Sequence, residues 1–103
     1  MHRRHVRIQI DSNSRRIDYF NIEGFNLNPD QYFRFISGRW VADLPNFPIG
    51  PDNDLDILTV AVGNPFTNST MAVEVDNQNK GSYQLFQPFN RNGYGHFNQH
   101  IPI

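Results

Sequence analysis

The chain has no cysteine, no long apolar run and few charged residues, and each absence excludes a class of protein or site. Without cysteine, neither disulfides nor thiolate metal sites can form. The longest uninterrupted apolar runs hold only a few residues, far fewer than the roughly 20 that a membrane-spanning helix needs. We therefore expect no membrane partner.

A secretory signal is not expected either. The basic start of the chain, residues 1–6, is not followed by the apolar segment that a signal peptide needs. A chain without cysteine fits a reducing cytoplasm, but secreted domains without cysteine also exist. The localisation therefore stays unknown, between a cytoplasmic chain and a secreted one whose signal has been removed.

Charged residues make up 18% of the chain, against about 25% in an average domain, and they are unevenly distributed. The first sixteen residues contain five arginines and a single acid, whereas acids outnumber bases in the rest of the chain. Arginine makes planar contacts with carboxylates, phosphates and aromatic rings, which suits it to interfaces. We therefore predict a homo-oligomer in which the basic first segment meets acidic surface on a neighbour. The alternative is that these arginines meet acids of their own chain.

The chain also lacks helical periodicity, since no stretch keeps the i, i+3, i+4, i+7 spacing of an amphipathic helix beyond about one turn. Apolar and polar residues alternate instead, most clearly over 6–10 and 71–75, which is typical of half-buried strands. Asn, Asp, Gly and Pro fill the gaps between the short apolar runs. We therefore predict an all-β fold: a single antiparallel β-sandwich or jelly roll over residues 1–103, with about seven short strands.

The alternation places the strands as follows. The predicted strands cover 6–10, 17–27, 32–36, 40–42, 55–62, 70–75 and 83–89, with a last short pairing within 97–103. Changes of parity within 17–27 predict a bulge or bend there. Three prolines within 43–54 predict a long loop, because proline cannot donate to a β-ladder. Apolar residues on both faces of 55–62 predict a central strand buried on both sides, with 70–75 paired beside it.

Metal sites find little support in the spacing of the possible ligands. The acidic tract 52–56 offers oxygen ligands for Ca²⁺ but lacks the glycine and the terminal glutamate of an EF-hand, so a solvated turn is favoured. His96 and His100 would share one face of a strand about 13 Å apart, too far to bind one ion. A zinc site would need His2 and His5 to converge on them. We therefore assign no metal ligands and no cofactor.

Motifs for catalysis are also absent. The chain has no Gly-x-Ser-x-Gly turn, no His-Glu-x-x-His and no glycine-rich phosphate loop, so we expect a protein that is not an enzyme. A glycoside hydrolase using carboxylates of 52–56 is the weakest alternative. Nucleic acid is an improbable partner, because the overall charge is slightly acidic and no nucleic-acid-binding signature is present.

The polar loops carry the candidate ligand site. Neutral sugars are held by amides and carboxylates, with an aromatic ring under the apolar face of the sugar. The candidate residues are Trp40, Asp52, Asn53, Asp54, Asn90, Arg91, Asn92, Tyr94 and His96. The sequence thus favours a non-enzymatic, lectin-like binding module with a glycan ligand. The alternatives are a self-associating shell, inclusion or appendage subunit for the chain, a core anchor for Trp40, and plain turn chemistry for the amides.

Overall fold

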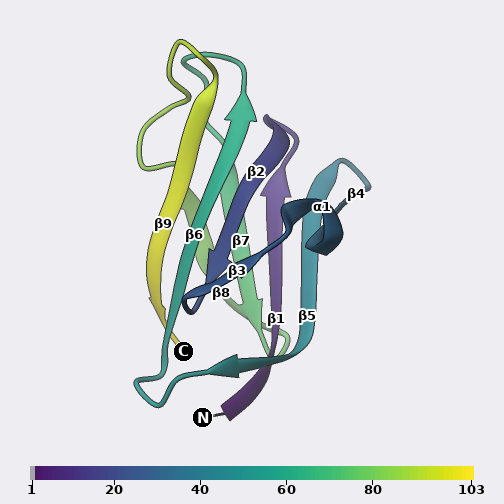
Figure 1. The fold of residues 1–103 in the computed structure, drawn as a ribbon, viewed down its shortest axis with the longest axis vertical. Helices are drawn as coiled ribbons and strands as arrows, with labels where there is room; N and C mark the ends of the chain where they lie inside the picture. Colours follow the sequence, from purple (N-terminus) through teal and green to yellow (C-terminus); the bar gives the residue numbers. More distant parts are fainter. Residues whose placement is uncertain (1) are drawn as a thin grey trace.

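A computed structural model describes residues 2–103, in which nine strands and one helical turn follow one another along the chain (Figure 1). The elements are β1 (His2–Asp11), β2 (Ser14–Ile22), β3 (Phe25–Leu27), α1 (Pro29–Tyr32), β4 (Phe33–Ile36), β5 (Arg39–Ile49), β6 (Asp54–Gly63), β7 (Thr70–Val75), β8 (Gln78–Gln84) and β9 (Tyr94–Pro102). No helix among these residues is long and apolar enough to cross a membrane.

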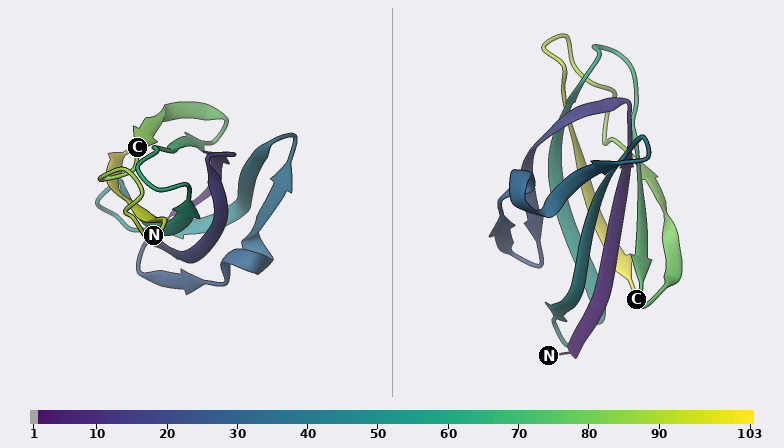
Figure 2. Two further views of the ribbon diagram at one scale, coloured as in Figure 1. Left: turned by 90° about the horizontal axis from the view of Figure 1, so that it is seen from above. Right: turned by 90° about the vertical axis from the view of Figure 1, so that its right-hand side faces the viewer.

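The strands form two antiparallel sheets. One sheet has five strands in the order β4-β5-β1-β7-β8, and the other has four in the order β3-β2-β6-β9. Viewed along the strands, the two sheets curve around a shared interior (Figure 2). The predicted all-β antiparallel sandwich is confirmed, with nine strands in place of about seven.

The core lies between the sheets and is built by the inward half of each alternating strand. Val6, Ile8 and Ile10 of β1 are fully buried from one side, and Phe20 and Phe97 of the opposite sheet are fully buried from the other. Each buried aromatic side chain removes about 150–250 Å² from water, so these rings contribute a large share of the apolar burial. Alternate residues of the strands therefore point into the core, as the sequence predicted.

The predicted long loop over 43–54 is wrong. The strand β5 runs through Pro45 and Pro48 to Ile49, and only residues 50–53 turn the chain. β4 pairs only with residues 39–42 of β5, so both prolines lie where one side of β5 has no strand partner. Proline is tolerated at such edge positions because no ladder donor is lost on the free side.

The predicted pairing of 70–75 beside 55–62 is also wrong. β7 pairs with β1 and β8 in the five-stranded sheet, and residues 64–69 carry the chain across from the other sheet. β6 is central, between β2 and β9, but it is buried on one face only, and Leu58 on the other face is exposed. A two-layer sandwich has no third layer to cover that face.

The later strands differ from prediction as well. Of the strand predicted over 83–89, only Tyr83 and Gln84 are extended, as the end of β8. This strand begins directly after a turn at Asp76 and Asn77, which both have positive φ. The amide-rich tail is a nine-residue strand, β9, paired with the full length of β6. Pairing with β6 outweighs the weak strand propensity of its Gly, Asn and His residues.

The segment predicted as one strand over 17–27 is a hairpin. Glu23 and Gly24 both have positive φ, which gives a tight two-residue turn between β2 and β3. The predicted bulge is confirmed as a register shift between Ile17 and Tyr19. Tyr32 belongs to the single helical turn α1, so the strand predicted over 32–36 begins at Phe33.

Candidate functional site

The solvent-facing side of the four-stranded sheet, here called the outer face, gathers most of the chemistry. Many of its side chains lie on β6 and β9. These two strands are paired, so outward side chains face one another in cross-strand pairs. The outward pairs, from one end to the other, are Asp54–Pro102, Asp56–His100, Leu58–Asn98, Val60–His96 and Val62–Tyr94. The face is therefore acidic at one end and aromatic at the other.

A groove lies at the aromatic end of the outer face. Its volume is about 390 Å³, and it is lined by Leu58, Val60, Asn90, Tyr94, Gly95 and His96. Tyr94 keeps 47% of its surface exposed, so its ring is available to a ligand. Three of the predicted site residues, Asn90, Tyr94 and His96, are thus brought together here.

Phe86 extends the aromatic end of the groove. Its backbone N–H donates to the His96 carbonyl at 2.8 Å, which holds residues 85–90 against β9. The two rings stack with centroids 5.3 Å apart and an interplanar angle of 23°. Phe86 is 70% exposed. Sequence reasoning missed this residue because it was placed inside a predicted strand, and its contact with β9 depends on the chain folding back.

Asn90 has two functions at the mouth of the groove. Its Oδ1 accepts from the backbone N–H groups of Asn92 and Tyr94, both at 2.9 Å, which closes the turn into β9. The turn chemistry considered for these amides is therefore present, and it leaves the side-chain NH₂ of Asn90 as a possible donor to a ligand. Arg91 and Asn92 are exposed at the tip of this turn and do not line the groove.

β2 adds polar groups on the opposite side of β6. The Tyr19 hydroxyl donates to Asn26 Oδ1 at 2.6 Å, and the Asn21 amide donates to the same oxygen at 2.7 Å. Arg16 pairs with Asp18 through two contacts of 2.5 and 3.0 Å. The hydrogen bond that Arg16 donates to Asp18, and then the Asp18 charge, raise the pKa of the Arg16 guanidinium, with Tyr94 adding a smaller effect. This cation is therefore already engaged.

The other predicted site residues lie elsewhere. Asp52 and Asn53 lie just before β6, and Asp54 is its first residue, about 13 Å along the strand from Leu58, the nearest groove residue on β6, at ~3.3 Å per residue. Asp52 Oδ1 accepts from the Asp54 N–H at 3.2 Å, so the turn that the sequence favoured for this acidic tract is present. Trp40 is in the other sheet, where its Nε1–H donates to the Ser14 carbonyl at 2.6 Å and its ring packs on the core margin.

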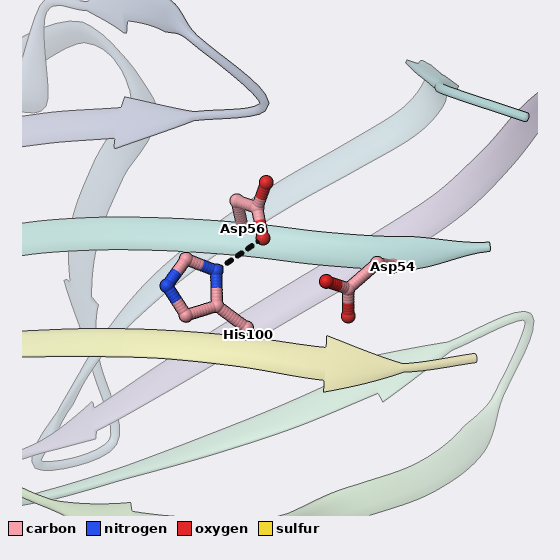
Figure 3. Close-up of side chains that lie close together, drawn as sticks. All are labelled: Asp54, Asp56 and His100. Carbon is pink, nitrogen blue, oxygen red and sulfur yellow. Dashed lines mark hydrogen bonds and ion pairs between the residues drawn. The ribbon is translucent and has the colours of Figure 1, made fainter. Parts of the chain in front are cut away.

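A second cluster occupies the acidic end of the outer face (Figure 3). His100 Nδ1 and Asp56 Oδ1 are 2.5 Å apart, and one ligand atom from each of Asp54, Asp56 and His100 lies within 4.8 Å of the others. The Asp56 hydrogen bond and charge raise the pKa of the His100 imidazole above its ordinary value. The sequence analysis missed this cluster because it considered the acids and histidines separately. An i, i+2 acid pair opposite a histidine becomes visible only once strand register is known.

Comparison with protein-family models, with curated proteins and with solved structures finds no match for this chain.

Proposed function

We propose that the chain is a non-enzymatic binding module and that the groove on its outer face binds a neutral carbohydrate. The observation that supports this most is the open groove in which the Tyr94 ring and the stacked Phe86–His96 pair lie beside the free amide NH₂ of Asn90. Aromatic rings stack on the apolar C–H face of a sugar, and amides bond its hydroxyls.

The electrostatics of the groove favour an uncharged ligand. His96 is the one basic side chain among the six lining residues, and none of the six is an acid. The nearest guanidinium on β2, that of Arg16, is occupied by Asp18. An anionic ligand would need a free cation to offset its desolvation, and a neutral polyol does not.

The proposal is tested by screening the folded chain on a glycan array and titrating any binder by calorimetry. Tyr94→Ala and Phe86→Ala each remove an exposed ring, and we expect either to weaken binding by about tenfold or more, as for an aromatic hot spot. Phe35→Ala is the matched control, because Phe35 is a comparably exposed ring on the other sheet. Absence of any glycan binder, with folding intact, overturns the proposal.

A second candidate function is the self-associating subunit. β4 is an edge strand of the five-stranded sheet, and its Phe35 and Ile36 are 55% and 52% exposed. An unpaired edge that carries apolar side chains can pair with the edge of another copy. Phe35→Ala therefore serves both proposals, since it should weaken assembly through β4 and leave sugar binding unchanged.

A further inference from the structure

We propose that Asp54, Asp56 and His100 bind a zinc ion at the acidic end of the outer face. These residues lie outside the groove, so the inference is independent of carbohydrate binding. Asp54 and Asp56 are two apart on β6 and point to the same side, and His100 is the cross-strand partner of Asp56 on β9 (Figure 3). Three donors thus converge from two hydrogen-bonded strands.

The distances are those of a site that closes with small side-chain rotations. Ligands around zinc, at bond lengths of about 2.0–2.2 Å in a tetrahedron, lie about 3.3–3.6 Å from one another. The donor atoms of the cluster range from 2.5 Å apart, for His100 Nδ1 and Asp56 Oδ1, to at most 4.8 Å. The required spacing therefore lies within the observed range. Rotation of exposed side chains can reach it without moving the strands.

The backbone beneath the cluster is fixed by its own hydrogen bonds. Glu23 Oε1 accepts from the Asp56 N–H at 2.8 Å, and the Glu23 N–H donates to the Asp56 carbonyl at 2.9 Å. The Asp54 N–H is held by Asp52, and the Ile103 N–H donates to the Asn53 carbonyl at 3.0 Å. A rigid backbone lowers the entropy lost when the ion fixes the side chains.

The donor types select zinc over calcium or magnesium. Zn²⁺ accepts imidazole nitrogen and carboxylate oxygen together at four-coordinate sites, whereas Ca²⁺ takes six to eight oxygens. Asp54 and Asp56 are half-buried and His100 is exposed, so the fourth position faces solvent. Water, or a donor from a binding partner, would complete the coordination.

The test is a calorimetric titration of Zn²⁺ into the metal-free full chain at mildly basic pH, which favours deprotonated ligands, followed by NMR of the histidine side chains. We expect one ion per chain and a shift of the His100 imidazole signals. His100→Ala and Asp54→Asn should each lower the affinity at least about tenfold. His96→Ala, four residues along the same strand, should leave it unchanged.

Three results would overturn the proposal. One is the absence of zinc binding by the folded chain, and another is unchanged affinity in His100→Ala. The third is tighter binding of Ca²⁺ or Mg²⁺ than of Zn²⁺, which would mean that the imidazole is not a ligand. Because all three side chains face outward, the variants should keep the wild-type circular dichroism spectrum. Should one unfold, a zinc-dependent rise in the melting temperature of the wild type alone decides in favour of the site.

Discussion

Thr59 is the residue whose environment fits it least. Its side chain is fully buried in β6, between Phe20 and Phe97 on the neighbouring strands, and within residues 2–103 its hydroxyl is the one buried side-chain polar atom without a partner. A buried unpaired hydroxyl costs about 1–3 kcal/mol of desolvation. We therefore expect Thr59→Val, which keeps the shape, to raise the free energy of unfolding by about 1 kcal/mol in urea denaturation.

Ser69 supplies the control for that prediction. It is buried like Thr59, but its hydroxyl donates to Asp11 at 2.6 Å and lies 2.7 Å from the Ser14 hydroxyl, which must then be the donor. Ser69→Ala removes one of the hydrogen bonds to Asp11, leaves the buried Ser14 hydroxyl without its acceptor, and should destabilise by about 1–3 kcal/mol. Equal effects of the two substitutions would mean that hydrogen bonding does not set their cost.

At the residue scale, the sequence predicted types of residue better than contacts. It named Tyr94, His96 and Asn90 among the ligand candidates because aromatic and amide side chains suit a sugar, and the structure brings these three residues together in one groove. It could not separate them from Asp52 or Trp40, since distance along a strand and sheet membership depend on pairing. Phe86 and the pairing of His100 with Asp56 were missed for the same reason: each contact forms only when the chain folds back onto β9 or β9 pairs with β6.

Among the elements, the end of β6 depends on the absence of a side chain at Gly63. A Cβ there would lie 2.5 Å from the Asn13 carbonyl and would also collide with the ring of Phe89. We expect Gly63→Ala to destabilise by about 2–3 kcal/mol, the upper range for overpacking, in a urea titration. Gly50→Ala is the control: its Cβ would make only ordinary contacts, so an equal loss there would refute the steric explanation.

The turn between β7 and β8 is fastened to β1 by Asp76. Its carboxylate accepts from the His5 backbone N–H at 3.0 Å and pairs with Arg4 at 2.5 Å. The hydrogen bond from His5, followed by that from Arg4, lowers the pKa of Asp76. A lowered folded-state pKa means that the unfolded chain binds the proton more readily. The stabilisation is therefore present above about pH 4 and lost as pH falls through the folded-state value.

Asp76→Asn tests this pH dependence. We expect the variant to be less stable than wild type at neutral pH and to lose less stability between about pH 5 and 2, in urea titrations at each pH. Parallel curves for the two proteins would show that Asp76 is not the titrating group. Asp30→Asn, an exposed acid whose side chain lies on α1, is the control.

Strand existence was more predictable than strand partners. Alternation located β1, β6 and β7, because period-two burial is a local property. The predicted bounds match those of β7 and fall one residue short of β6 at each end, whereas β1 begins four residues earlier than predicted. Beyond residue 42, one side of β5 has no partner strand because β4 ends there. This free side accommodates Pro45 and Pro48. The crossing of residues 64–69 between sheets likewise cannot be distinguished from a hairpin by length alone.

At the scale of the whole molecule, the homo-oligomer stays a prediction. The structure separates two forms of assembly, one held by charges and one by apolar edges. Four of the five arginines of the first segment contact their own chain: Arg3 at the Asn46 carbonyl, Arg4 at Asp76, Arg15 at Asn64 and Arg16 at Asp18. An assembly held by such charges should dissociate in ~1 M salt, where the Debye length is ~3 Å. Assembly through apolar β4 edges should persist in that salt.

Sedimentation at low and high salt measures this difference. We expect association that survives salt and is lost in Ile36→Lys, because a charged side chain on an edge strand opposes pairing. Tyr94→Ala is the control and should sediment as wild type. A monomer under both salt conditions at high protein concentration would rule out both forms of assembly.

The pairing of β6 with β9 also determines when, during folding, the two binding sites form. Both the groove and the zinc cluster draw residues from strands separated by about thirty positions of chain, and long-range pairing forms slowly during folding. Neither site exists until β9 has docked. Until then β6 is an open edge carrying Leu58, Val60 and Val62, a segment prone to pair with other chains. Docking of β9 therefore protects β6 from aggregation. Ligand binding measured during refolding would report when β9 has docked.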